Sequence, residues 1–231
     1  MDIVYCIDEK VLDQMERSAE TVKKFNPDAH VIVISESPLK TKYDHMVRKL
    51  PNIPFRHSHG DRLSDATYMR MFLPEWLNMD KVLYLDADTL CTGKLDELFQ
   101  QKIEYIGACH SHNFGIRQAQ QIGIKTYALD SVLLLNLNNL RKIGYTENAI
   151  AAMQHGIFPK TTWYCAETLL NCCFSKLITF LDLKWNFCVN RNYDQYLDAI
   201  KEEDAVILHF IGPNKDRMKE YYEKMKELHA L

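Results

Sequence analysis

The sequence has no long hydrophobic run, little glycine or proline, and no internal repeat. Its longest apolar segments, such as Val132–Leu135, are far too short to cross a bilayer, so we expect no transmembrane span. The 231 residues include only 8 glycines and 7 prolines, and none of them gather into a linker-like or low-complexity tract. These absences favour one continuous domain over residues 1–231.

The cysteines lack the spacing of a metal site and the parity of a disulfide framework. There are seven, with no C-x-x-C pair, and most of them lie in apolar runs, where cysteine behaves as a small hydrophobe. The pattern indicates a reducing compartment. Because the segment Met1–Tyr5 has no basic region followed by a long apolar stretch, no signal peptide is evident, and we expect a cytoplasmic protein.

A basic excess is also missing. The chain has 28 Lys and Arg against 31 Asp and Glu, a formal net charge of -3, so nothing suggests a protein that neutralises nucleic-acid phosphates. Hydrophobic residues at 47% and charged residues at 26% are ordinary for a globular domain.

Short β-rich runs alternate with helical patterns, which predicts an α/β domain with a Rossmann-like, mixed but mostly parallel sheet flanked by helices. The predicted strands cover residues 2–7, 30–34, 53–57, 81–85, 105–109, 132–137 and 205–210. The predicted helices cover residues 9–25, a stretch between 35 and 52, 64–76 with Ser64 as N-cap, 146–154, 166–175, and a charged C-terminal helix at 214–231.

The strongest single feature is an apolar strand, Lys81–Leu85, that ends in Asp86-Ala87-Asp88. Ligands of open α/β sheets bind at the carboxyl ends of the strands. Two carboxylates at that edge suit a divalent cation that keeps positions open for phosphate oxygens. A helix-capping role for one aspartate and a solvated position for the other would also fit this motif.

A second segment, Ile207–Lys215, contains residue types that would complete such a site. His209 at a strand end can supply an imidazole ligand to an ion such as Mn²⁺. Gly212 lets the backbone approach a phosphate closely, and Lys215 can pair with one. Taken singly, a core histidine and a surface lysine at a helix start are equally ordinary interpretations.

In order and spacing together, these segments resemble the family 8 glycosyltransferases, the group that contains glycogenin and bacterial lipopolysaccharide galactosyl- and glucosyltransferases. The resemblance covers most of the chain. Ile3–Asp8 is similar to the family's opening strand, whose end holds the uracil. Tyr68-Met69-Arg70 is similar to its Tyr-x-Arg motif, and Asp86-Ala87-Asp88 is similar to its D-x-D motif. The other similar segments are Leu169-Leu170-Asn171, Trp185-Asn186-Phe187 and His209-x-x-Gly212-x-x-Lys215.

The resemblance implies an A-type glycosyltransferase fold, a UDP-sugar donor, Mn²⁺ or Mg²⁺, and retention of the anomeric configuration. It implies that Asp86, Asp88 and His209 hold the metal. The residues implied at the nucleotide and its diphosphate are Cys6, Asp8, Arg70, Ala87, Gly212 and Lys215. We therefore predict hexose transfer from UDP-glucose or UDP-galactose to a saccharide or glycan acceptor, with Arg70 adding positive charge where the leaving diphosphate becomes more negative.

The sugar half of the expected site departs from the family. Leu129-Asp130-Ser131 replaces its Asn-Ala-Gly, and Ala166-Glu167-Thr168 replaces its Asp-Gln-Asp. Glu167 could stabilise an oxocarbenium ion or attack the sugar. It also suits the first turn of a helix, and the family's front-face mechanism needs no enzyme nucleophile. Asp130 is likewise open to two interpretations. It is either a turn residue or an acceptor for a sugar hydroxyl, and in the second case it joins Glu167 and Arg70 as a candidate catalytic residue.

Two other functions remain open. The departures at 166–168 also fit a protein that binds nucleotide and metal but has lost transfer. A haloacid-dehalogenase-type phosphohydrolase shares the strand-D-x-D-Thr pattern, although its second motif, resembled by Gly60-Asp61, would lie upstream here.

The C-terminal helix presents an apolar stripe with Tyr222 and Met225, which would suit peripheral contact with a membrane surface. Membrane-surface helices are usually much more basic than this one, in which aspartate and glutamate residues balance most of the lysines and arginines. Packing of the stripe on the domain is the favoured interpretation.

Overall fold

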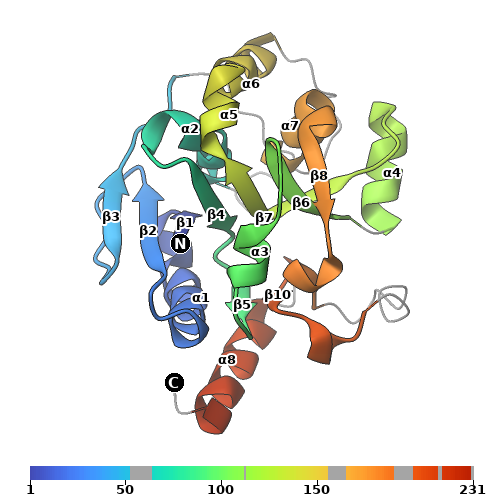
Figure 1. Cartoon of the computed structure of the whole chain (residues 1–231). Helices are drawn as coiled ribbons and strands as arrows, with labels where there is room; N and C mark the ends of the chain where they lie inside the picture. The colour runs from blue at the N-terminus through green and yellow to red at the C-terminus, as the bar shows by residue number, and fades with distance from the viewer. Residues whose placement is uncertain (53–63, 112, 156–164, 190–199, 213–214, 230–231) are drawn as a thin grey trace.

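The computed structural model describes residues 1–52, 64–111, 113–155, 165–189, 200–212 and 215–229. These residues form a mixed sheet covered by helices on both faces, with a small second sheet below it (Figure 1). The strand expected at 53–57 and the Gly60-Asp61 motif lie outside the described residues.

The main sheet is parallel except for one strand. Its strands in spatial order are β3 (Asp44–Val47), β2 (His30–Ser35), β1 (Asp2–Cys6), β4 (Lys81–Leu85), β7 (Ala128–Asn136), β6 (Ile106–His110) and β8 (Ile178–Leu181). Only β7 among these strands runs opposite, pairing antiparallel with β4 and β6. This is the mixed, mostly parallel sheet that the sequence predicts.

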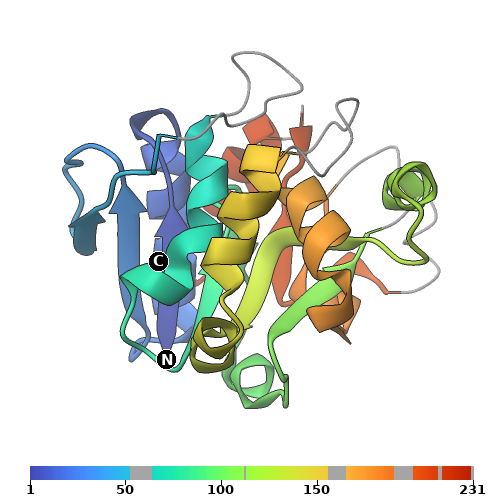
Figure 2. The same ribbon diagram turned by 90° about the horizontal axis from the view of Figure 1, so that it is seen from above.

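Helices occur on both sides of the sheet because the buried strands carry apolar residues on both faces. The α-helices are α1 (Leu12–Phe25), α2 (Leu73–Trp76), α3 (Asp96–Gln100), α4 (Asn113–Ile122), α5 (Leu137–Lys142), α6 (Tyr145–His155), α7 (Cys165–Phe174) and α8 (Lys215–His229). Val4 and Tyr84 face a core that includes residues of α2, α5, α6 and α7, whereas Tyr5 and Leu83 face α1. Figure 2 shows α6 and α7, yellow and orange, side by side over the first of these faces.

A three-stranded sheet joins distant parts of the chain. In it β10 (Ile207–His209) lies between β5 (Thr89–Cys91), which is antiparallel to it, and β9 (Phe187–Cys188), which is parallel to it. Because His209 pairs with Thr89, the late histidine comes to lie beside the early D-x-D segment.

Three predicted elements differ from the structure. The stretch between 35 and 52 contains β3 rather than a helix, because its backbone pairs with β2 at the sheet edge. The predicted helix at 64–76 is a 3₁₀-helix, Asp65–Phe72, followed by the short α2, and the Ser64 side chain makes no capping bond. Pro74 has no N–H for the carbonyl four residues earlier, and its ring crowds that carbonyl, which disfavours a continuous α-helix through this segment. The predicted strand at 205–210 shortens to β10. The elements that were not predicted include α3, α4, α5, β5, β8 and β9.

The C-terminal helix packs on the domain. Met218 and Tyr222 of α8 are buried in a cluster with Leu90, Leu208 and Phe210, as the sequence analysis favoured. Leu228 near its end is 78% exposed. None of the helices formed by the described residues is long and apolar enough to cross a membrane.

Candidate active site

The site lies where β1 and β4 end. These strands are parallel neighbours, so residues that follow Cys6 and Leu85 meet at one edge of the sheet. A cavity of about 160 Å³ opens there, and the Asp86-Ala87-Asp88 segment and Arg70 belong to its lining. It shares Ile7, Asp8, Lys10, Ser64 and Ala66 with a neighbouring hollow of about 630 Å³. A small polar cavity therefore adjoins a space large enough for part of an organic ligand.

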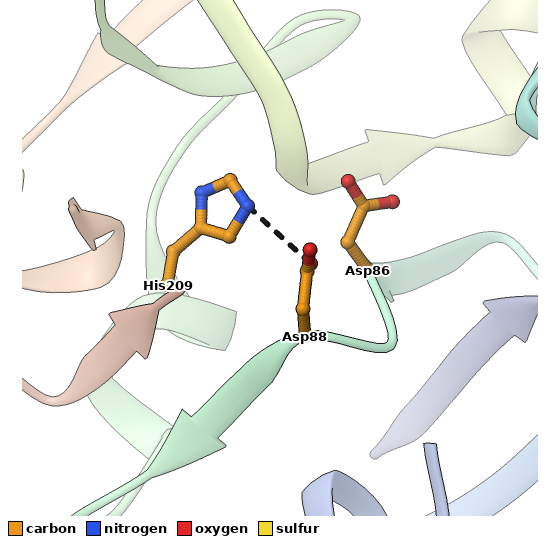
Figure 3. A group of neighbouring side chains, drawn as sticks. All are labelled: Asp86, Asp88 and His209. Atoms are coloured by element: carbon orange, nitrogen blue, oxygen red, sulfur yellow. Dashed lines mark ion pairs between the residues drawn. The ribbon is translucent and has the colours of Figure 1, made fainter. Parts of the chain in front are cut away.

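Asp86, Asp88 and His209 converge at this edge (Figure 3). One ligand atom from each lies within 4.8 Å of the others, and His209 Nε2 is 3.4 Å from Asp88 Oδ1. Two carboxylates and an imidazole at such separations suit a divalent transition-metal ion, with Mn²⁺ compatible with both ligand types. The side chains that the sequence predicted as metal ligands are thus brought together.

Neighbouring side chains fix the orientation of Asp86. Its Oδ1 accepts hydrogen bonds from Arg70 Nη2 at 2.9 Å and from the Tyr84 hydroxyl, and its backbone carbonyl accepts one from Thr89 Oγ1 at 2.8 Å. With Oδ1 committed to protein donors, the other carboxylate oxygen is the one suited to a metal ion.

His209 is buried against Asp88. Burial disfavours the imidazolium, but Asp88 and Cys188 together outweigh burial and hold the pKa of His209 well above its ordinary value. On its other side, Nδ1 lies 3.0 Å from Ser131 Oγ. Metal binding must release any proton on Nε2, so affinity for the ion should fall at low pH.

Arg70 is only 5% exposed, and every nitrogen of its guanidinium group faces a protein acceptor. Nε and Nη2 bond to Thr67 and Asp86, and Nη1 lies 2.6 Å from the Asp130 carbonyl and 2.8 Å from Asp130 Oδ2. The family resemblance implies that Arg70 lies near the diphosphate. Its described polar side-chain contacts are with Thr67, Asp86 and Asp130, and they link the metal side of the site to Asp130.

Asp130 and Glu167 form the other side. Burial raises the pKa of the Asp130 carboxyl to about 6, even though Arg70 acts to lower it. Burial and the neighbouring Asp130 raise the pKa of Glu167 well above its ordinary value. Glu167 lies in the first turn of α7. The Asn171 side chain connects this helix to β7, because its Oδ1 accepts a hydrogen bond from Ala128 N at 2.8 Å and its Nδ2 donates one to the Ala128 carbonyl at 2.9 Å.

The remaining predicted residues occupy different positions. Cys6, Asp8 and Ala87 line the small cavity, and Asp8 Oδ1 also accepts a hydrogen bond from Lys10 N at 2.9 Å. Gly212 follows β10 with a φ of +60°, a conformation that favours glycine. Lys215 begins α8, but its side chain lies outside the described part of the chain.

Sequence reasoning assigned no role to Thr67, Tyr84 or Asn186, and it named Ser131 only as part of a departure from the family. These residues orient the named ones through hydrogen bonds. For Asn186 and Ser131 a signal existed, since both lie in segments that carried the family comparison. For Tyr84 the alternation of the strand gave only a buried position.

The chain belongs to glycosyl transferase family 8, whose sequence model matches residues 2–216. This membership supports the glycosyltransferase interpretation over the phosphohydrolase alternative.

Among curated proteins, the chain is similar to a putative glycosyltransferase of Haemophilus influenzae, with 28% identity over 67% of this chain and 49% of that protein. It is also similar to the lipopolysaccharide glucosyltransferase WaaO of Escherichia coli, with 24% identity over 68% of this chain and 53% of that protein. The chain thus spans about half the length of the curated relatives it matches.

Solved structures share the fold. The galactosyltransferase LgtC, in complex with donor and acceptor sugar analogs, matches with a TM-score of 0.75 at 20% identity, covering 97% of this chain and 96% of that one. The apo form of GlyE from Streptococcus pneumoniae matches with a TM-score of 0.73 at 20% identity, covering 96% of this chain and 59% of that one. The domain therefore has the A-type glycosyltransferase fold.

Proposed function

We propose that this protein is a metal-dependent, retaining hexosyltransferase that moves glucose or galactose from a UDP-sugar to a saccharide or glycan acceptor. The observation that carries the proposal is the convergence of Asp86, Asp88 and His209 beside a cavity at the carboxyl ends of β1 and β4. Family membership and similarity to relatives named as glucosyl- and galactosyltransferases support it.

The three converging side chains would hold Mn²⁺ or Mg²⁺ at this edge. When bound, the ion supplies Lewis-acid stabilisation of the negative charge that develops on the leaving diphosphate. Arg70 holds Asp86 in place for this task, and its own charge offsets part of the negative charge of Asp86 and Asp130. The hollow lined by Asp8, Ser35 and Glu36 is the candidate space for the nucleoside.

Asp130 and Glu167 would contact the sugar. Burial raises the pKa of both carboxyls, so the neutral form, which can donate a hydrogen bond to a sugar hydroxyl, is more accessible for them than for an ordinary carboxyl. A nucleophile must be ionised, and the raised pKa of Glu167 therefore favours a hydrogen-bonding role over attack on the sugar. This agrees with a front-face mechanism in which the leaving phosphate oxygen serves as base.

The test is incubation with UDP-glucose and with UDP-galactose, each with Mn²⁺ or with EDTA, followed by measurement of UDP release and of the anomeric proton coupling of the sugar released at early times. We expect Mn²⁺-dependent release of an α-anomer from at least one donor, and its loss in Asp88→Asn. Asp96→Asn, which removes an exposed carboxylate from α3, is the matched control and should keep wild-type release.

A β-anomer as the first product would overturn retention. Mn²⁺-dependent binding of UDP, without release of sugar from either donor, would instead favour a protein that binds nucleotide but does not transfer sugar. The altered residues 166–168 also fit that alternative.

A further inference from the structure

The imidazole of His209 has a buried partner on each of its nitrogens. Nε2 points toward Asp88 (Figure 3), and Nδ1 lies 3.0 Å from Ser131 Oγ. Ser131 comes from β7 of the main sheet, whereas His209 comes from β10 of the small one. The contact therefore joins the two sheets at the ring of a candidate metal ligand.

A third residue supports this contact. Asn186, just before β9, places its amide against the same hydroxyl, with Nδ2 2.9 Å and Oδ1 3.3 Å from Ser131 Oγ. Ser131 is 2% exposed and Asn186 is fully buried. Cys188 of β9 is the strand partner of His209. Because Ser131 and Asn186 are buried, they are the side chains that meet Nδ1 of the ring in place of water.

The tautomer of His209 matters for metal binding. An imidazole nitrogen that binds a metal ion must offer its lone pair, so a neutral ring that binds through Nε2 carries its proton on Nδ1. That N–H needs a buried acceptor. Ser131 Oγ is at the right distance to accept it, and its own hydroxyl hydrogen can be donated in a hydrogen bond to Asn186 Oδ1.

We propose that Ser131 and Asn186 are positioning residues that hold His209 in its Nδ1–H tautomer and present Nε2 to the metal ion beside Asp88. The proposal rests on the proposed metal-dependent function. It adds two residues to which neither the family match nor the motifs assign a role. Ser131 stands where the family pattern that this segment resembles has glycine.

The first test is Mn²⁺ binding in the presence of saturating UDP, measured from the electron paramagnetic resonance signal of free Mn²⁺. Ser131→Ala removes the acceptor and should weaken Mn²⁺ binding by about 10- to 100-fold, the usual effect of losing a residue that supports a metal ligand. Ser131→Thr keeps the hydroxyl and should restore most of the affinity.

The control variant is Thr146→Val, which deletes a buried hydroxyl that donates to the Met71 carbonyl at 2.9 Å, away from His209. It should reduce thermal stability without changing Mn²⁺ affinity. Equal Mn²⁺ affinity in Ser131→Ala and wild type would overturn the proposal. If the wild type itself fails to bind Mn²⁺ with UDP, the proposed function fails instead.

The second test needs no variant and covers the case in which Ser131→Ala does not fold. ¹⁵N-edited NMR of the wild-type histidine side chains, with diamagnetic Mg²⁺ and UDP bound, reports which nitrogen of His209 is protonated. We expect the proton on Nδ1. A proton on Nε2, with Ser131 donating to Nδ1, would overturn the proposal.

Discussion

At the scale of residues, the site is organised around one buried cation. Arg70 lies between Asp86 and Asp130 and over the ring of Tyr84, with its guanidinium carbon 4.5 Å from the ring centroid. Burial opposes its charge, but Asp130 and Asp86 outweigh burial and keep the pKa of Arg70 above its already high ordinary value. Its planar, forked geometry allows it to bind both carboxylates and Thr67 at once.

Arg70→Lys should therefore weaken both the fold and the site. A lysine cannot reach all these acceptors, so we expect the free energy of unfolding to fall by about 1–3 kcal/mol and UDP–Mn²⁺ binding to weaken because Asp86 loses its orientation. Chemical denaturation and calorimetric titration measure the two effects. Arg141→Lys is the matched control, since Arg141 bonds to the carbonyls of Pro74, Leu77 and Met79, and it should lower stability only.

Loss of stability in Arg70→Lys with unchanged UDP–Mn²⁺ affinity would limit Arg70 to a role in the fold.

Glu167→Gln should stabilise the protein at neutral pH. The folded-state pKa of Glu167 is raised above the unfolded value of about 4.3, so its contribution to stability is fully present below that value and is lost as pH rises through the folded-state pKa. Glutamine does not ionise, so the variant does not lose this stability as the pH rises. The melting temperature of Glu167→Gln should therefore exceed that of the wild type by a margin that grows as pH rises from about 5 to 8.

Glu104→Gln, which removes an exposed carboxylate from the loop before β6, is the control, and its margin over the wild type should change less with pH than that of Glu167→Gln. A margin for Glu167→Gln that stays constant with pH would contradict the raised pKa.

The sequence could identify the ligand types of the site but not its hydrogen-bond network. Asp86 and Asp88 were recognisable because they end an apolar strand, and His209 because it ends another. Ser131 and Asn186 act through contacts across 78 and 55 residues of sequence separation, respectively. Such contacts follow from how sheets and helices pack, which residue spacing does not specify.

At the scale of elements, β10 is the strand that completes the site. It pairs with β5, so that Phe210 N donates to the Asp88 carbonyl at 2.9 Å and His209 is fixed beside the D-x-D segment. The chain then turns at Gly212 toward α8. This turn is the candidate contact between backbone and diphosphate.

Gly212→Ala should weaken UDP–Mn²⁺ binding more than its effect on stability explains. At a φ of +60° alanine is strained by roughly 1–2 kcal/mol, although its Cβ would meet no protein atom within 4 Å. Gly123, after α4, has a φ of +72° and equally open surroundings, which makes Gly123→Ala a matched control. Thermal melts of the two variants with and without UDP–Mn²⁺ give the ligand-induced rise in melting temperature of each.

Equal ligand-induced shifts in Gly212→Ala and Gly123→Ala would place the diphosphate away from Gly212.

The central elements were predictable because their apolar patterns indicate a strand or a helix without any information on tertiary contacts. Lys81–Leu85 is β4 as predicted, and helices near 146–154 and 166–175 appear as α6 and α7. The edge strand β3 was not predictable, because Asp44–Val47 has few apolar residues and its structure depends on pairing with β2. The 3₁₀ conformation of Asp65–Phe72 likewise depends on Pro74 and on packing against the sheet.

At the scale of the whole molecule, α8 ties the end of the described chain back to the small sheet. Met218 is 1% exposed in the cluster that also holds Leu208 and Phe210, so α8 braces the strand that carries His209. The same packing occupies part of the apolar stripe that peripheral membrane contact would need.

Met218→Ala should lower the free energy of unfolding by about 2–5 kcal/mol, since it leaves a cavity in a packed cluster. Leu228→Ala, at the exposed end of the same helix, should change stability by less than about 0.5 kcal/mol. Chemical denaturation measures both. Unchanged stability of Met218→Ala, together with weaker binding to lipid vesicles, would favour a membrane-facing helix instead.

Metal-dependent nucleotide binding at the end of β4 is the central claim, and a thermal-shift measurement tests it most directly. A ligand that binds only the folded state raises the melting temperature by mass action. UDP should therefore stabilise the wild type with Mn²⁺ but not with EDTA, and Asp88→Asn should lose the Mn²⁺-dependent part while keeping its own fold. Equal stabilisation by UDP in EDTA and in Mn²⁺ would contradict the assignment of Asp86, Asp88 and His209 as the metal site.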